Sequence, residues 1–128
     1  MNGRKIVIIE DNPMNMELAV DVLEAGGYEV LTADNAEEGI RLVKSHLPAL
    51  VLMDISLPGM DGLDATRVLK GNPATRHIPV IAVTAHAMRG DEQRILDAGC
   101  SAYLAKPMDV QALRVEVARL IATGPSHD

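Results

Sequence analysis

The chain has 128 residues, of which 48% are hydrophobic and 2% aromatic, and its formal net charge at pH 7 is −6. This length suits one domain with an aliphatic core, so we expect residues 1–128 to form a single domain with a core over about 5–122 and a frayed tail at 123–128. Binding of nucleic acid requires a basic surface, and insertion into a membrane requires a longer apolar run, so the sequence excludes both. The single cysteine, Cys100, excludes an internal disulfide and predicts a cytoplasmic protein.

Apolar runs alternate with helical patterns five times along the chain. The expected strands are 6–9, 28–31, 50–53, 79–83 and 102–105. The helices are expected from Pro13 to a stop at Gly26–Gly27, from the cap Asn35 to about His46, from Asp61 through Leu69, from Asp91 to Ala98, and from the cap Asp109 through Ile121. In the fourth helix, Ile95 and Leu96 are both expected to face inward.

This alternation predicts an α/β fold, a doubly wound (βα)5 domain with a five-stranded parallel sheet. Continuous apolar runs are typical of parallel strands that are buried on both faces. Right-handed crossovers then place helices on both sides of the sheet. The strand order 2-1-3-4-5, as in flavodoxin-like folds, is the natural candidate, and it puts the first and third strands side by side. A ligand site is expected outside the carboxyl ends of the strands.

Acidic residues follow the two strands that this topology makes neighbours. Glu10 and Asp11 follow the first strand, and Asp54 follows the third. Carboxylates at close range repel one another unless a cation lies between them, and Mg²⁺ prefers oxygen ligands. We therefore predict a Mg²⁺ site, with Mn²⁺ as the alternative ion, made by these three residues and the backbone carbonyl of Ser56. The competing interpretation is that the acids only cap helices.

Asp54 is also the candidate nucleophile, because an aspartate can accept a phosphoryl group and form an aspartyl phosphate. Phosphoryl transfer requires positioning and charge neutralisation, which the Lys106 ammonium and the Thr84 hydroxyl would supply from neighbouring strand ends. Each of the two is by itself an ordinary surface or strand-end residue. We expect the Lys106–Pro107 peptide bond to be cis, which would fix a tight turn and aim the lysine inward.

Four stretches in a fixed order carry a family resemblance: IEDN at 9–12, MDISLPGMDG at 53–62, VTA at 83–85 and AKP at 105–107. Over roughly residues 5–122 the chain resembles the receiver domain of two-component response regulators. Its local sequence is similar to that of single-domain, DivK-like cell-division regulators in three stretches: EDNPMNM at 10–16, TAHAMRGDE at 84–92 and AGCSAY at 98–103. The first acidic pair is Glu-Asp rather than Asp-Asp, which lengthens one ligand and keeps the charge.

The resemblance implies a mechanism and partners. It implies Mg²⁺-dependent transfer of a phosphoryl group to Asp54 from a sensor histidine kinase or a histidine phosphotransfer protein, which would dock on the first helix. It also implies a switch made by Thr84 and Tyr103 with the loop 84–90. A downstream protein effector would read the face of the fourth helix, fifth strand and fifth helix, which carries Met88, Arg89, Arg94, Tyr103, Arg114 and Arg119.

Other functions are weaker alternatives. A haloacid-dehalogenase phosphatase would need a second aspartate two residues after Asp54, where this chain has Ser56. A nucleotide-binding protein would need a glycine-rich loop after the first strand. We expect no enzyme beyond catalysis of the chain's own phosphorylation and dephosphorylation. A metal-independent pseudo-receiver that acts as a protein-interaction module, and a receiver excised from a hybrid kinase, remain the alternatives.

Overall fold

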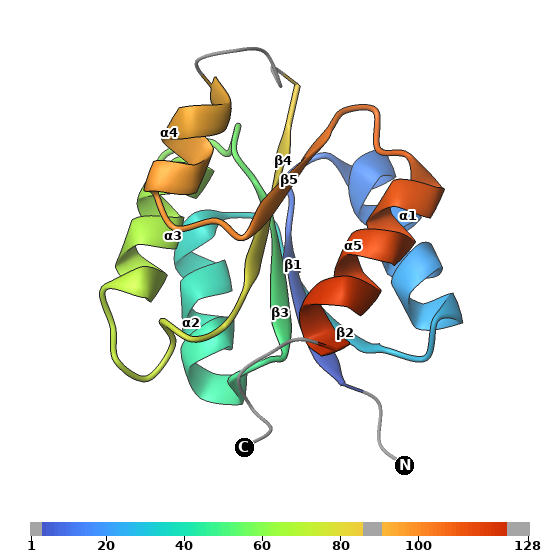
Figure 1. Ribbon diagram of the computed structural model, residues 1–128, viewed down its shortest axis with the longest axis horizontal. Helices are drawn as coiled ribbons and strands as arrows, with labels where there is room; N and C mark the ends of the chain where they lie inside the picture. The colour runs from blue at the N-terminus through green and yellow to red at the C-terminus, as the bar shows by residue number, and fades with distance from the viewer. Residues whose placement is uncertain (1–3, 86–90, 123–128) are drawn as a thin grey trace.

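The computed structural model describes residues 4–85 and 91–122, within which five strands alternate with five helices (Figure 1). The strands are β1 (Lys5–Ile9), β2 (Glu29–Ala33), β3 (Leu50–Asp54), β4 (Val80–Thr84) and β5 (Ala102–Ala105). The helices are α1 (Pro13–Ala25), α2 (Ala36–His46), α3 (Gly62–Lys70), α4 (Asp91–Asp97) and α5 (Val110–Ala122). The expected tail at 123–128 and the switch-loop residues 86–90, with Met88 and Arg89, lie outside the described residues.

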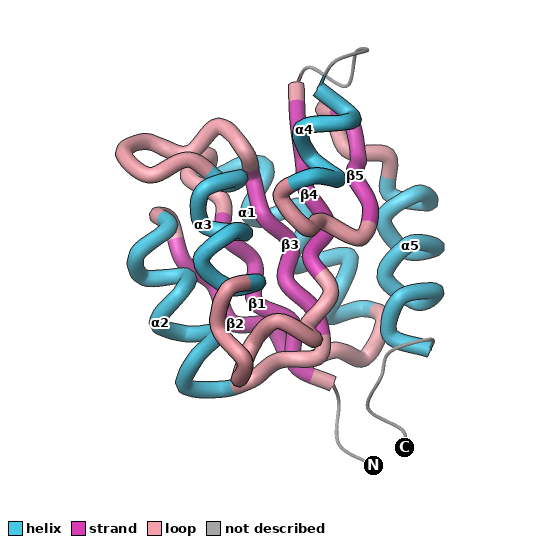
Figure 2. Tube along the Cα trace, turned by 60° about the vertical axis from the view of Figure 1, so that its left-hand side comes forward, coloured by secondary structure: helices cyan, strands magenta, loops and turns pink. Residues whose placement is uncertain are grey.

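The strands form one parallel sheet in the order β2-β1-β3-β4-β5, which confirms the predicted fold. Helices α2, α3 and α4 cover one face and α1 and α5 cover the other, as the two views together show (Figures 1 and 2). In the register of β1 and β3, Ile9 lies opposite Met53. Glu10 and Asp54, which follow these two positions, therefore lie together at the carboxyl ends of β1 and β3.

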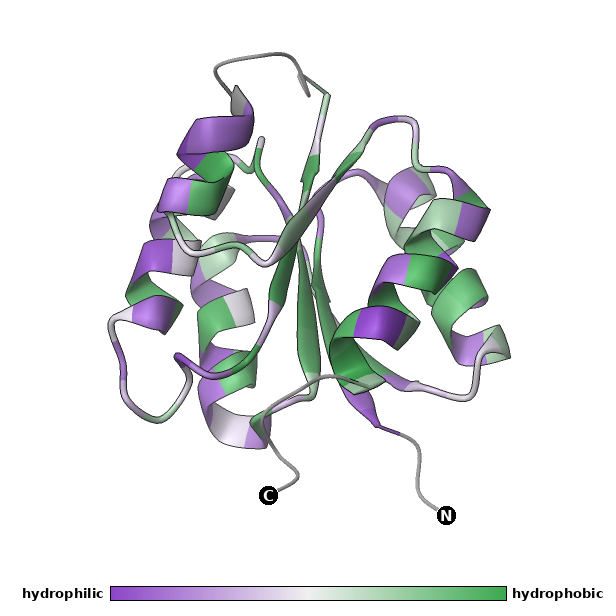
Figure 3. Cartoon of the chain, viewed as in Figure 1, coloured by the Kyte–Doolittle hydropathy of each residue, from purple (hydrophilic) through white to green (hydrophobic). Residues whose placement is uncertain are grey.

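Two aliphatic cores lie on the two faces of the sheet. One contains Val7, Val51 and Ala82 and continues under α2, α3 and α4. The other contains Ile8, Leu52 and Ile81 and continues under α1 and α5. Every residue of the central strands β3 and β4 is buried, which explains why their sequences are continuous apolar runs (Figure 3).

Short polar side chains begin the helices as the sequence predicted. Asn12 Oδ1 accepts hydrogen bonds from the backbone N–H groups of Met14 and Asn15, at 2.9 and 3.1 Å, and Pro13 is the first helical residue. Asn35, Asp61 and Asp109 cap α2, α3 and α5 in the same way. These caps satisfy backbone donors that have no partner inside the helix, so they fix where each chain segment turns away from the sheet edge.

Two local predictions were wrong. Strand β2 spans Glu29–Ala33 rather than 28–31. It begins later because the Tyr28 N–H instead donates to the Leu23 carbonyl at 3.2 Å, and it continues to Ala33 in register with β1. In α4, Ile95 is fully buried, but Leu96 is 47% exposed. Successive helical residues are about 100° apart, and the core side of α4 is already set by Ile95, with Ala98 directly after the helix also buried. Leu96 therefore faces outward.

Candidate functional site

Three carboxylates meet where β1 and β3 end. Glu10, Asp11 and Asp54 each place a carboxylate oxygen within 4.8 Å of the others. The side chains differ in their access to water, because Glu10 and Asp54 are buried and Asp11 is exposed. The predicted convergence of these acids is thus present in the structure.

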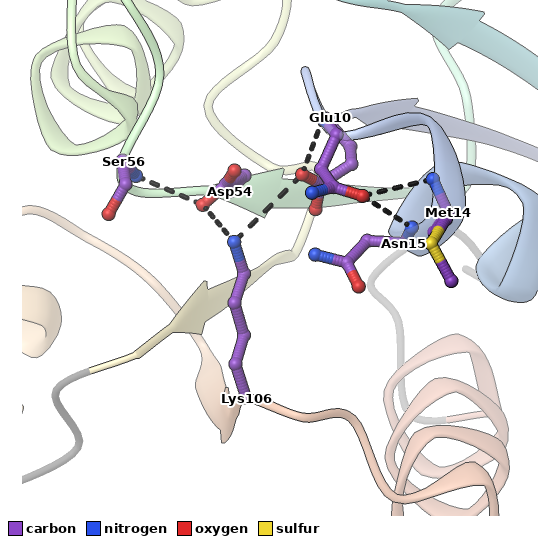
Figure 4. Close-up of polar contacts among 7 residues, drawn as sticks. Glu10, Met14, Asn15, Asp54, Ser56 and Lys106 are labelled. Carbon is purple, nitrogen blue, oxygen red and sulfur yellow. Dashed lines mark hydrogen bonds and ion pairs between the residues drawn. The ribbon is translucent and has the colours of Figure 1, made fainter.

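Within residues 4–85 and 91–122, one ammonium forms ion pairs with this cluster. Lys106, from the segment that follows β5, places its Nζ 3.1 Å from Asp54 Oδ1 and 3.9 Å from Glu10 Oε2 (Figure 4). The Lys106 backbone N–H donates to the Thr84 carbonyl at 2.8 Å, which ties this segment to the end of β4. The Lys106–Pro107 peptide bond is cis. The arrangement brings one positive charge to the buried acids.

The two oxygens of Asp54 have different surroundings. Oδ1 accepts the Ser56 backbone N–H at 3.0 Å and the ion pair from Lys106. Oδ2 is buried, and no group in the described part of the chain donates a hydrogen bond to it. A buried carboxylate oxygen without a donor is energetically costly. The donor set of clustered carboxylates with one unpartnered oxygen therefore fits a hard divalent cation, whose charge would compensate this oxygen.

The position of Glu10 makes its ionisation unfavourable. Burial, the largest cause, raises the pKa of Glu10 to about 7, and contact with the Asp54 carboxylate acts in the same direction. The Asn12 N–H, which donates to Glu10 Oε2 at 3.0 Å, and the Lys106 ammonium both oppose this rise. Asn12 thus caps α1 with its side chain and holds Glu10 with its backbone N–H, a second role that no sequence pattern indicates.

The two predicted switch residues occupy different places. Thr84, 4% exposed, ends β4, one residue beyond Val83, which is paired with Asp54. Tyr103 is half-buried on β5 and packs against the core under α2, α3 and α4, so it is not part of the carboxylate cluster. A hydrogen bond to Glu92 in α4 is the largest cause that raises the pKa of the Tyr103 phenol. Tyr103 therefore lies on β5 beside the core that α4 covers.

A family model for the response regulator receiver domain matches residues 6–118. The chain belongs to the response regulator receiver family. It is 50% identical, over 107 residues, to the polar-differentiation response regulator DivK of Brucella anthropi, a match that covers 84% of this chain and 87% of that protein. The DivK proteins of Brucella abortus strains match at the same identity and over the same shares.

Solved receiver structures share the fold. The receiver domain of the sensor histidine kinase PA1611 of Pseudomonas aeruginosa PAO1 superposes with a TM-score of 0.88 and 35% identity, over 94% of this chain and 99% of that one. That structure has a magnesium ion coordinated in its active site cleft. The receiver domain of a signal transduction histidine kinase from Syntrophus aciditrophicus gives 0.89 and 32%, over 98% and 96% of the two chains. In the described part of this receiver, no helix is long and apolar enough to cross a membrane.

One residue beside the site was missed. Gly62 begins α3 and lies against the backbone of Asp54, where a side-chain carbon would be only 2.3 Å from the Asp54 carbonyl oxygen. Local sequence carries no signal for this contact, because the backbone that excludes a side chain comes from the end of β3.

Proposed function

We propose that this receiver is a phosphorylation-controlled response regulator in which Asp54 accepts a phosphoryl group in a Mg²⁺-dependent reaction. The observation that carries the proposal is the environment of the Asp54 carboxylate, which is buried between an ammonium and two further acids and has one oxygen without a donor. Such a group is poised for charge to be added and neutralised, which is what phosphoryl transfer requires.

Glu10, Asp11, Asp54 and the Ser56 carbonyl would hold the ion, with Mn²⁺ as an alternative to Mg²⁺. The unpartnered Asp54 oxygen and the separation of at most 4.8 Å among the carboxylates support this ligand set. The Mg²⁺ reported for the receiver of PA1611 supports it from a relative. When bound, the ion supplies positive charge that neutralises the phosphoryl oxygens.

The side chains then have separate roles. A carboxylate oxygen of Asp54 forms the new oxygen–phosphorus bond as the phosphorus–nitrogen bond of a phosphohistidine breaks. The Lys106 ammonium, already 3.1 Å from Asp54 Oδ1, balances negative charge on the phosphoryl group. The Thr84 hydroxyl, at the end of the neighbouring strand, donates a hydrogen bond to a phosphoryl oxygen. Hydrolysis by water returns the free carboxylate, so the protein catalyses only its own modification.

The partners follow from the same chemistry. The phosphoryl donor is a sensor histidine kinase or a histidine phosphotransfer protein. After phosphorylation of Asp54, the α4-β5-α5 face binds a downstream protein. Alternatively, the phosphoryl group passes to a second histidine. The identity of 50% with polar-differentiation regulators supports a DivK-like role. We propose that this role is the control of cell division and that the protein acts in the cytoplasm. Tyr103 packs against the core under α4, so a movement of its side chain would alter this face.

The experiment is to mix the protein with acetyl phosphate, with and without Mg²⁺, and to measure its intact mass beside an Asp54→Ala variant. We expect one phosphate adduct that requires Mg²⁺ and is absent from the variant. An adduct that forms equally in EDTA, or equally in Asp54→Ala, would refute the proposal. A chain that takes no phosphoryl group from acetyl phosphate or from phosphohistidine proteins would instead be a pseudo-receiver that acts by binding alone.

A further inference from the structure

Gly62 occupies a place in which only a hydrogen atom fits. It is buried at the first position of α3. A carbon added there would lie 2.3 Å from the Asp54 carbonyl oxygen, 2.7 Å from the Ile55 Cα and 3.0 Å from the Asp54 carbonyl carbon. Ordinary contacts begin at 3.4 Å, so the two segments would have to separate by about 1 Å. All three atoms belong to the backbone, so no side-chain rotation relieves the overlap.

The helix cannot easily be the segment that moves. Leu63 and Ala65, in its first turn, are 2% and 0% exposed in the core. The hydroxyl of the fully buried Thr66 donates to the Gly62 carbonyl at 2.8 Å, which ties the first turn to the next one. Since closely packed cores resist such shifts, at least part of the displacement would fall on the Asp54–Ile55 peptide, where the chain passes from the buried Asp54 to the half-buried Ile55 and the exposed Ser56.

That peptide carries the reacting group. The Ile55 N–H donates to the Val83 carbonyl and the Ile55 carbonyl accepts from the Gly62 N–H, both at 3.0 Å. One residue further on, the Ser56 N–H holds Asp54 Oδ1. A displaced peptide would therefore move the Asp54 carboxylate relative to Lys106 and move the Ser56 carbonyl relative to the acids.

We propose that Gly62 is a positioning residue for the phosphorylation of Asp54: its missing side chain lets the start of α3 press on the Asp54–Ile55 peptide and hold the carboxylate in register with Lys106 and the metal ligands. This inference rests on the function proposed above and goes beyond it. A misplacement of about 1 Å costs on the order of a hundredfold in rate when reacting groups must be aligned.

The test compares Gly62→Ala with Gly39→Ala. A carbon added at Gly39, in α2, would also lie 2.3 Å from a neighbour, but its near neighbours are Cδ1 and Cγ1 of the Ile9 side chain, at 2.3 and 2.5 Å, rather than backbone atoms, and a side chain can change rotamer. Both variants therefore introduce an overlap of similar size into a packed region. For each protein we would measure the thermal midpoint in EDTA, Mg²⁺ affinity by NMR titration of backbone amides, and the initial rate of adduct formation with acetyl phosphate.

We expect Gly62→Ala to lower the rate about a hundredfold and to weaken Mg²⁺ binding at least tenfold while it remains folded. Gly39→Ala should change both quantities less than threefold, even where its thermal midpoint falls by a similar amount. A Gly62→Ala variant with wild-type rate and Mg²⁺ affinity would overturn the inference. So would losses in both variants that simply follow their loss of stability.

Two further observations keep the inference open to refutation. If Gly62→Ala does not fold, Thr66→Val removes the hydroxyl that ties the first turn of α3 without adding an overlap, and we expect a several-fold loss of rate; an unchanged rate would overturn the inference. If the wild-type chain binds Mg²⁺ but takes no phosphoryl group, the proposed function fails, and the Mg²⁺ affinities of the two glycine variants still decide the role of Gly62.

Discussion

At the scale of single residues, the site places two buried carboxylates close together beside one ammonium. Glu10 and Asp54 are both buried, their carboxylates are close, and Lys106 is the one ammonium that the described residues place against both. Such an arrangement destabilises the fold unless a cation is added, because buried like charges repel. The same repulsion between carboxylates favours the binding of a divalent ion, whose charge would also neutralise a phosphoryl group.

The pKa of Glu10 predicts a pH dependence in metal-free protein. Because it lies at about 7 in the folded chain, against 4.5 for an ordinary glutamate, the folded state binds more protons than the unfolded state between these values. The contribution of Glu10 to stability is therefore most favourable below pH 4.5 and is lost as pH rises to about 7. Urea unfolding in EDTA at pH 5 and pH 8 measures it: relative to the wild type, Glu10→Gln should be more stable at pH 8 than at pH 5.

Added Mg²⁺ supplies the control for this pH dependence. Protons and the cation compete for Glu10, so Mg²⁺ should stabilise the wild-type protein more at pH 8 than at pH 5. The Glu10→Gln variant should lose most of that difference. Equal stabilisation by Mg²⁺ at both pH values would show that Glu10 does not bind the ion.

Removal of the Lys106 ammonium should affect the reaction more than the fold. Lys106→Ala should lower the rate of adduct formation by about a hundredfold, because the loss of one charge-stabilising donor in an active site costs this much. Mg²⁺ should still bind, since Lys106 repels the cation. Time courses of intact mass with acetyl phosphate measure the rate, and Lys44→Ala, on the exposed side of α2, is the matched control. A Lys106→Ala rate within twofold of the wild type would contradict the assigned role.

At the scale of helices and strands, α4 contains two similar aliphatic residues that differ in burial. Ile95 is 0% exposed and Leu96 is 47% exposed, although both are large aliphatic residues. Ile95→Ala should lower the free energy of unfolding by about 2–5 kcal/mol, because it leaves a cavity. Leu96→Ala should change it by less than about 0.5 kcal/mol. Urea denaturation of the two variants measures both values, and similar losses would mean that α4 packs differently.

The element scale also shows what sequence alone can predict. The sheet order could be predicted from three features: the apolar runs, the caps Asn12 and Asn35, and the alternation of strands with helices. Few topologies satisfy all of them. The inward face of α4 could not be predicted, since seven residues give too short a period to choose between Ile95 and Leu96. The role of Gly62 could not be predicted from the sequence, because the backbone that excludes a side chain there comes from the end of β3.

At the scale of the whole molecule, the site lies where elements from both cores meet. Asp54 ends the fully buried strand β3, while α1 begins at Pro13, two residues after the Glu10–Asp11 pair, and Lys106 precedes α5. The carboxyl ends of β1, β3, β4 and β5 therefore lie at the same end of the sheet (Figures 1 and 4). Strands β4 and β5 lie between Asp54 and the helices α4 and α5, which is the route that the proposed response would take.

The most direct test is to locate the added phosphoryl group. After reaction with acetyl phosphate and Mg²⁺, the acyl phosphate is reduced with borohydride, and peptide mass spectrometry identifies the residue that was modified. We expect Asp54 alone to be modified, and only in the presence of Mg²⁺. Modification of Glu10 or Asp11 in place of Asp54, or a modified Asp54 in EDTA, would contradict the proposed metal-dependent phosphorylation.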